Sequence, residues 1–213
     1  MARRRKGLGD RRVRHDHAYR RAKAEGKVAR AVYKLEEIDR SFRLLRRGRR
    51  VLDLGCWPGS WLAYAAERVG PDGLVVGVDL RAVEIPLPPH VHTAVADVST
   101  LDPTALVERF GPFDLVASDM APHTSGDRGT DQHRSEALAF AALRLALSVL
   151  RPGGHFVVKV FQGPRFSALL GDVRRAFSEA RAVVPPSTRA ASREQYLVGR
   201  GRRTRLPDDL APA

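Results

Sequence analysis

The sequence predicts an α/β fold with a mostly parallel central sheet and helices on both faces. Short apolar runs alternate along the chain with segments whose apolar residues recur at helical spacing, which is the pattern of strand–helix–strand units. A loop bracketed by two glycines follows the first apolar run, at the position where open α/β sheets bind their ligands. The 213 residues suffice for one domain with a good-sized core.

The elements can be placed in order from the spacing of the apolar residues. The first is an amphipathic helix that begins near Ala29 and ends before Gly48, with apolar residues at intervals of three and four: Val32, Leu35, Ile38, Phe42 and Leu45. Five strands are expected next, at residues 51–54, 74–78, 91–96, 113–118 and 155–161. Helices are expected between them, at residues 59–69, 104–110 and 131–150. A last helix at 165–178 should lead to two edge strands, at 181–184 and 195–198, and to a frayed tail from residue 200 onward.

The positive charge of the chain is concentrated near its start. The net charge is +13, and residues 1–50 hold 19 Lys and Arg against 6 Asp and Glu, whereas residues 51–213 hold 18 of each kind. Residues 1–20 show no apolar period, so we expect a disordered basic arm there, a single domain over residues 21–203 and a tail over 204–213. A nucleic acid partner is favoured over a solubilising role, because a solubilising tail needs no single sign of charge.

Cysteine content and hydropathy exclude several classes of protein. Cys56 is the single cysteine, which excludes an internal disulfide framework, offers no metal site and fits a reducing cytoplasm. No apolar run reaches the roughly 18 residues that a membrane span needs, and the arginine-rich start lacks the apolar segment of a signal peptide. We therefore expect a cytoplasmic monomer with no metal and no membrane partner.

The glycine-bracketed loop favours one kind of ligand. Residues 51–61 read Val-Leu-Asp-Leu-Gly-Cys-Trp-Pro-Gly-Ser-Trp, which predicts a strand, a loop and the start of a helix in a Rossmann-like sheet. A dinucleotide fingerprint requires a glycine where this chain has Trp57, and the Gly-Lys-Ser/Thr of a P-loop is missing from the sequence. The loop therefore favours a ligand that carries adenosine without phosphates, namely S-adenosylmethionine. Trp57 itself has the alternative of a packing residue.

Two acidic residues at other strand ends support a cofactor site. Asp79 ends the second expected strand, where a carboxylate can accept hydrogen bonds from both ribose hydroxyls, and Asp97 ends the third, where it could accept one from the adenine amino group. The alternative for each is to cap the segment that follows it.

Lysine is rare outside the first part of the chain. From Arg40 onward the sequence has 23 arginines and one lysine, Lys159, which lies in the apolar run 155–161. A desolvated lysine can lose its proton and act as a base, whereas arginine stays protonated. We therefore expect this position to require a lysine that can become neutral, in preference to a surface lysine at a strand end. Asp119 follows the fourth strand, so both side chains should lie at the same edge of the sheet.

Several segments resemble, in the same order, the FtsJ family of ribosomal RNA large subunit 2′-O-ribose methyltransferases. The segments that carry the resemblance are residues 30–35 (Arg-Ala-Val-Tyr-Lys-Leu), 51–61, 118–122, 153–163 and 192–194. The resemblance implies an S-adenosylmethionine-dependent methyltransferase fold and a catalytic tetrad of Lys34, Asp119, Lys159 and Glu194. It places the cofactor contacts at Gly59, Trp61, Asp79, Asp97 and Asp119. Ser60 departs from the family, which usually has a second glycine there, and Cys56 and Trp57 replace residues that are commonly small.

The resemblance also implies a reaction and a substrate. The reaction is transfer of a methyl group from S-adenosylmethionine to a ribose 2′-hydroxyl, with Lys159 as the base. The substrate is a uridine in the A-loop of 23S ribosomal RNA in the 50S subunit, which the basic arm over residues 1–20 would help to bind. Two alternatives remain open: 2′-O-methylation of tRNA or another RNA, and a ribosome-assembly factor that binds RNA without catalysis. An oxidoreductase that uses a nicotinamide cofactor is disfavoured by Trp57.

Overall fold

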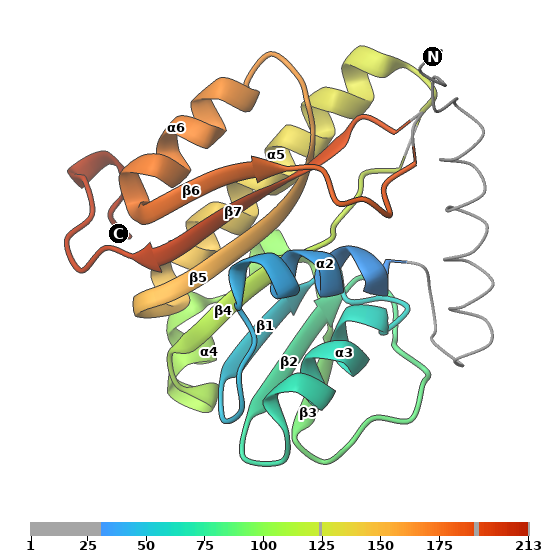
Figure 1. Cartoon of the computed structure of the whole chain (residues 1–213), viewed down its shortest axis with the longest axis vertical. Coiled ribbons are helices and arrows are strands. Elements are labelled where there is room, and N and C mark those ends of the chain that lie inside the picture. The colour runs from blue at the N-terminus through green and yellow to red at the C-terminus, as the bar shows by residue number, and fades with distance from the viewer. Residues whose placement is uncertain (1–30, 124, 190–191, 213) are drawn as a thin grey trace, which may run out of the picture.

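The computed structural model describes residues 31–123, 125–189 and 192–212. Seven strands form one sheet in the order β3-β2-β1-β4-β5-β7-β6 (Figure 1). Their bounds are Arg50–Leu54 (β1), Leu74–Asp79 (β2), Val91–Val95 (β3), Phe113–Ser118 (β4), Leu150–Phe161 (β5), Phe177–Val183 (β6) and Glu194–Arg202 (β7). Strands β1 to β5 are parallel, and β7 is antiparallel to both β5 and β6. The expected mostly parallel sheet is thus confirmed. The basic arm expected over residues 1–20 lies outside the described residues.

Helices cover both faces of this sheet. Their bounds are Val32–Phe42 (α2), Ser60–Val69 (α3), Pro103–Phe110 (α4), Arg128–Val149 (α5) and Phe166–Ala176 (α6), with short 3₁₀ helices at Val98–Thr100 and Asp208–Leu210. Figure 1 shows α2 and α3 in front of the sheet and α5 behind it. Alternate strand residues serve the two faces: Val157 packs in the core beneath α2 and α3, whereas Val158 packs in the core beneath α5 and α6.

The first helix is shorter than its apolar pattern indicates. The structure describes α2 from Val32 to Phe42, and Arg43 ends it in a left-handed conformation with φ of 55°. The buried carboxylate of Asp39 then accepts a hydrogen bond from the Leu45 backbone N–H at 2.8 Å. Leu45 therefore belongs to the core, as its spacing suggests, but lies in the turn that Asp39 stabilises.

The last helix and the edge strands also differ from the expectation. Helix α6 ends at Ala176, two residues early, because Phe177 starts β6. The Phe177 ring stacks on Phe156 with centroids 6.0 Å apart, and a Cβ atom at Gly199 would lie only 2.7 Å from the Phe177 ring. The bare glycine in β7 thus makes room for an aromatic side chain whose burial favours strand over helix.

Residues 200–202 belong to β7 and are not a frayed tail. Strand β7 extends to Arg202, and the N–H of Gly201 donates to His155 Nδ1 at 3.2 Å. Further along, Leu206 and Leu210 pack against the core. None of the described helices is long and apolar enough to cross a membrane.

The topology brings distant parts of the sequence to one edge of the sheet. Leu54 at the end of β1 pairs with Ser118 at the end of β4, and Ser118 pairs with Val158 in β5. Because β7 is antiparallel, its first residue, Glu194, pairs with Phe161 at the end of β5. The carboxyl ends of the parallel strands and the start of β7 therefore meet at this edge.

Candidate active site

Lys159 and Asp119 form an ion pair at this edge. Lys159 Nζ lies 3.0 Å from Asp119 Oδ1 and also donates a hydrogen bond to the Asp119 backbone carbonyl oxygen at 2.6 Å. The Lys159 side chain is 8% exposed, so its apolar neighbours desolvate it as expected. Adjacent strands deliver the two groups, which is why the sequence order alone could place them together.

Lys34 and Glu194 form a second ion pair. Lys34 lies in the first turn of α2, and Glu194 is the first residue of β7. Their side chains are 17% and 12% exposed, so water screens the pair only partly. Spacing in the sequence could not have brought these two residues together, because one comes from a helix in front of the sheet and the other from an antiparallel strand.

Tyr196 contacts the Lys159–Asp119 ion pair, and the sequence analysis missed it. Its hydroxyl donates to Asp119 Oδ1 at 2.7 Å, and its backbone pairs with Lys159 across the β5–β7 ladder. It lies two residues after Glu194, so both side chains leave the same face of β7. The signal that could have found it is this alternation within Glu194-Gln195-Tyr196.

Burial keeps the Tyr196 hydroxyl protonated. Desolvation raises the pKa of Tyr196 well above its ordinary value, and the negative charges of Asp119 and Glu194 raise it further. Its ring packs on Trp61 with centroids 6.0 Å apart. Tyr196 is therefore a fixed hydrogen-bond donor to Asp119.

Asp79 holds together the loops that follow β1 and β2. Its Oδ2 accepts from the Trp57 backbone N–H and its Oδ1 from the Arg81 backbone N–H, both at 3.0 Å. A carboxylate has roughly four acceptor positions, so these bonds fix its orientation and leave capacity for a ligand. The Trp57 side chain is 47% exposed and lies 4.8 Å from the Arg81 guanidinium, which argues against the core-packing alternative for this residue.

Asp97 caps the segment that follows it, which is the alternative role that the sequence analysis left open for this residue. Its Oδ1 accepts from the Ser99 backbone N–H at 2.8 Å and from the Ser99 hydroxyl at 2.7 Å. These hydrogen bonds lower the pKa of Asp97, so the group is an anion at neutral pH. A cap on one oxygen is compatible with a ligand on the other.

Gly59 lies in a tight turn under the segment after β2, whereas Trp61 is buried in the core. Gly59 has φ of 107°, and a Cβ atom there would lie 2.7 Å from Ile85, so glycine lets the segment after β2 fold over the start of α3. Trp61 is buried, and its indole N–H donates to the Ala31 carbonyl oxygen at 2.9 Å.

Cys56 is also buried, and this burial raises the pKa of its thiol, which makes it an unreactive packing residue.

Asp53 is a second feature that the sequence analysis missed. It is 1% exposed, and neither carboxyl oxygen has a hydrogen-bond partner among the described residues. Desolvation raises the pKa of Asp53 well above its ordinary value, and the charges of Asp119 and Asp79 add to this effect. A buried carboxyl without a partner lies where a ligand amine or hydroxyl could satisfy it.

The donor set at this edge fits a positively charged nucleoside cofactor. Asp79, Asp97 and Asp119 lie at strand ends, where their carboxylates would repel the phosphates of a nucleotide. Carboxylates are suited to ribose hydroxyls, to an amino group and to the positive charge of a sulfonium. The residues present therefore fit S-adenosylmethionine and disfavour a dinucleotide.

Comparison with known proteins identifies the family. The family of FtsJ-like methyltransferases matches residues 27–202. The chain belongs to this family. It is 50% identical over 187 residues to the ribosomal RNA large subunit methyltransferase E of Syntrophobacter fumaroxidans, covering 86% of this chain and 94% of that protein. It is 47% identical over 184 residues to the protein of the same name from Desulfosudis oleivorans, covering 86% and 89%.

The fold agrees with this assignment. A crystal structure of a ribosomal RNA methyltransferase from Plasmodium falciparum superposes with a TM-score of 0.72 at 25% sequence identity, covering 83% of this chain and 99% of that one. The expected Rossmann-like methyltransferase fold is thereby confirmed, and the chain is an enzyme of this FtsJ-like family.

The edge of this FtsJ-like methyltransferase is divided into two halves. One half, at β4, β5, β7 and α2, holds the four residues of the expected tetrad, which the structure brings together as two ion pairs. The other half, at β1, β2 and β3, holds the carboxyl groups that could bind a cofactor. Asp119 lies between the halves: its N–H donates to the Leu54 carbonyl of β1, and its side chain belongs to the tetrad.

Proposed function

We propose that this methyltransferase transfers a methyl group from S-adenosylmethionine to a ribose 2′-hydroxyl of large-subunit ribosomal RNA. The expected target is a uridine of the A-loop of 23S ribosomal RNA, within the assembled 50S subunit, and the expected setting is the cytoplasm, where the enzyme would act as a monomer. The names of the two bacterial relatives support the choice of ribosomal RNA. The observation that carries the chemistry is the position of the buried Lys159. Its Nζ faces two acceptors on Asp119, one carboxylate oxygen and the backbone carbonyl oxygen.

This geometry suits Lys159 to remove a proton. The ion pair with Asp119 is formed by the protonated ammonium, so Lys159 would act as a base only after it loses one proton. The neutral amine has two N–H bonds and one lone pair, and Asp119 offers two acceptors, at 2.6 Å and 3.0 Å from Nζ. Because both N–H directions would then be taken, the lone pair of Lys159 would point away from Asp119, and we propose that the 2′-hydroxyl binds on that side. Lys159 would take the hydroxyl proton as the ribose oxygen attacks.

The remaining residues would orient the reactants. When bound, S-adenosylmethionine supplies a methyl group that its positive sulfur already activates, so the protein must chiefly align two reactants and accept one proton. Asp79 and Asp97 would hold the ribose and the adenine, with Gly59, Trp61 and Asp119 as further contacts. Lys34, which forms an ion pair with Glu194, would supply a positive charge near the developing alkoxide.

Transfer of radiolabelled methyl groups tests this proposal. Undermethylated 50S subunits, free ribosomal RNA and bulk tRNA would be offered in parallel with labelled S-adenosylmethionine, and the modified nucleotide would then be mapped. Label on a ribose 2′-oxygen of 50S RNA is the expected result. Label on tRNA would keep the chemistry and change the substrate, whereas bound cofactor without any transfer would favour a non-catalytic assembly factor.

A further inference from the structure

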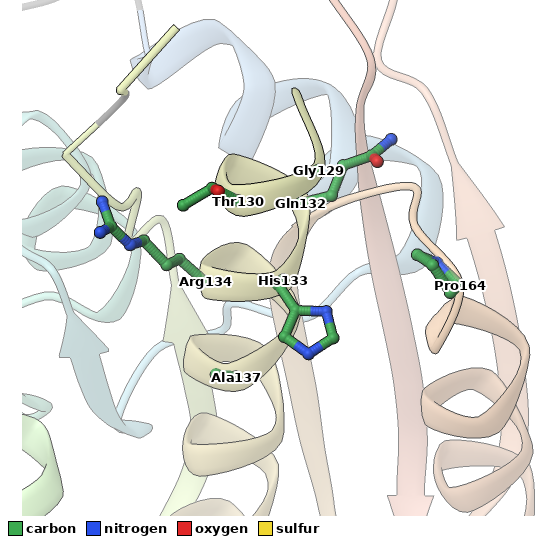
Figure 2. Close-up of a pocket in the computed structure, with 7 residues that line it drawn as sticks. All are labelled: Gly129, Thr130, Gln132, His133, Arg134, Ala137 and Pro164. Atoms are coloured by element: carbon green, nitrogen blue, oxygen red, sulfur yellow. The ribbon is translucent and has the colours of Figure 1, made fainter. Parts of the chain in front are cut away.

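A pocket separate from the tetrad lies on the α5 side of the sheet. Its volume is about 630 Å³, and its walls come from the first turns of α5 and from Pro164 in the loop between β5 and α6. Figure 2 shows the imidazole of His133 and the ring of Pro164 at the same opening, one from each wall, with the amide of Gln132 above them. Neither the tetrad nor the carboxyl groups of the cofactor half line this space.

Hydrogen bonds fix the pocket relative to the catalytic strand. Three of them join α5 to the segment that follows Lys159: Gln132 Nε2 to Gln162 O at 2.7 Å, Phe161 N–H to Ser135 Oγ at 2.9 Å, and Arg165 N–H to Glu136 Oε1 at 2.8 Å. Pro164 lies five residues after Lys159, which at roughly 3.5 Å per residue keeps it within about 18 Å of the proposed base. A polynucleotide bound at the tetrad can therefore reach the pocket.

The side chains around the pocket suit a flat and partly polar ligand. His133 and Pro164 are exposed rings, and the imidazole is a surface on which nucleobases stack. Thr130 and Gln132 add a hydroxyl and an amide to the lining. The nearby acids are engaged locally, because Asp127 accepts from the Thr130 N–H at 2.8 Å and Asp131 from the Ser125 N–H at 2.8 Å.

Cationic side chains accompany these rings. Arg134 lines the pocket and reaches toward the His123 carbonyl oxygen at 3.4 Å, and Arg165 places its guanidinium 4.4 Å from the centroid of the Phe140 ring. Arg134 lies near enough to Asp131 to help lower the pKa of that carboxyl, so Arg165, whose printed contact is with the Phe140 ring, is the better candidate for a phosphate contact.

We propose that this pocket binds an unpaired nucleobase that neighbours the methylated nucleotide, by stacking it between His133 and Pro164. The inference rests on the proposed function in that the ligand is taken to be the substrate RNA. Stacking of a base is tolerant of sequence, so the pocket would fix the RNA strand beside the tetrad and leave the choice of nucleotide to other contacts. His133 would thus be a positioning residue that touches RNA but not the reacting atoms.

Steady-state kinetics of His133 variants test the pocket. With undermethylated 50S subunits as the substrate, His133→Ala should raise KM roughly tenfold, as expected for the loss of one stacked base, with kcat nearly unchanged. His133→Phe should restore a KM close to that of the wild type, because a phenyl ring offers a flat face on which a base can stack. The matched control is His92→Ala, which removes an exposed histidine from β3 whose ring lies 5.6 Å from Phe110.

An unchanged KM in His133→Ala would disprove the proposed role of the pocket in binding a base. Methyl transfer by the wild type would still support the proposed function. A KM that Phe fails to restore would also disprove the role of the pocket, because stacking would not then be the contact. If the wild type transfers no methyl group, retention of the same 50S subunits on filters still tests the pocket: weaker binding by His133→Ala with recovery in His133→Phe supports it, and equal binding overturns it.

Discussion

At the level of single residues, Asp119 organises the proposed chemistry through one carboxylate oxygen. Its Oδ1 accepts from Tyr196 Oη at 2.7 Å and lies 3.0 Å from Lys159 Nζ. Two donors on one oxygen fix both the carboxylate and the lysine in a single orientation. The raised pKa of Tyr196 keeps its phenol protonated at neutral pH, so Tyr196 remains a donor to Asp119.

Lys159→Arg should remove turnover and leave the fold intact. Arginine keeps the positive charge beside Asp119, but it cannot give up its proton and so cannot act as a base. We expect kcat to fall by at least about 100-fold, with the affinity for S-adenosylmethionine unchanged in calorimetry. Near-normal methyl transfer by this variant would disprove the assignment of Lys159 as the base.

Tyr196→Phe should weaken catalysis, because it removes the hydrogen bond that the Tyr196 hydroxyl donates to Asp119 Oδ1. The substitution keeps the ring on Trp61 and removes only the hydroxyl, so we expect a fall in kcat of roughly tenfold with little change in KM for RNA. Loss of the hydrogen bond should also lower the free energy of unfolding by about 1 kcal/mol.

A second tyrosine provides the control for this prediction. Tyr64 donates to the buried Asp39 at 3.1 Å, and Asp39 lies on α2 five residues after Lys34 without belonging to either ion pair of the tetrad. Tyr64→Phe should lower stability by a similar amount and leave kcat at the wild-type value. Equal kcat values in the two variants would show that the Tyr196 hydroxyl serves stability alone.

At the level of elements, the sequence predicts the bounds of those strands and helices that depend on local apolar patterns. The strands that end at Leu54 and Ser118 were foreseen because their apolar runs and the residues that follow them are contiguous in the sequence. The end of α6 was not foreseen, since Phe177 enters β6 only because Gly199 and Phe156 accept its ring from distant positions. Tertiary packing overrides helical propensity at that point.

The same distinction applies to the site. Lys159 lies near the end of β5 and Asp119 directly follows the adjacent parallel strand β4, so a topological rule brings them together. Lys34 and Glu194 required the resemblance, because a helix in front of the sheet and an antiparallel strand share no such rule. Asp53 went unnoticed because its significance is its burial without a partner, which a sequence does not display.

The junction of β5 and β7 should make stability depend on pH. Burial lowers the pKa of His155 to about 4, and the charges of Arg49, Arg200 and Arg151 add to this effect. In the unfolded chain the same group titrates near its ordinary value of about 6.5. Between these values the unfolded state binds more protons, so the stabilisation present above pH 6.5 is lost as pH falls toward 4, by up to roughly 3 kcal/mol.

Urea unfolding of the wild type and of His155→Gln at pH 7 and pH 5 measures this effect. The wild type should lose more free energy of unfolding between the two pH values than the variant does, since glutamine does not titrate. A glutamine side chain can also accept the hydrogen bond that Gly201 N–H now donates to His155 Nδ1 at 3.2 Å. Identical pH dependence in the two proteins would rule out His155 as the titrating group.

At the level of the whole molecule, the negative charges at the catalytic edge do not attract RNA, so positive charge must be supplied by another part of the chain. The cofactor half carries Asp79 and Asp97 near the surface, and a polynucleotide that approaches this edge meets negative charge. Residues 51–213 have equal numbers of acidic and basic side chains, whereas residues 1–50 hold 19 Lys and Arg against 6 Asp and Glu. The attraction for RNA should therefore come mainly from the first fifty residues.

Deletion of residues 1–20 is the direct test of that attraction. This segment holds eight Lys and Arg and two Asp and Glu. Each phosphate contact that is lost should reduce the slope of log affinity against log salt concentration by roughly 0.7 to 0.9, so the truncated enzyme should bind 50S subunits more weakly and with less dependence on salt. Binding of S-adenosylmethionine should not change.

The matched control keeps the charge and changes its chemistry. Replacing the seven arginines of residues 1–20 by lysine preserves every positive charge, and lysine contacts phosphates as a point charge. If the segment acts through electrostatic attraction, this variant should keep the wild-type salt slope that the deletion loses. A deletion with an unchanged slope would instead assign RNA attraction to the folded part, where Arg134 lines the pocket and Arg165 follows its lining residue Pro164.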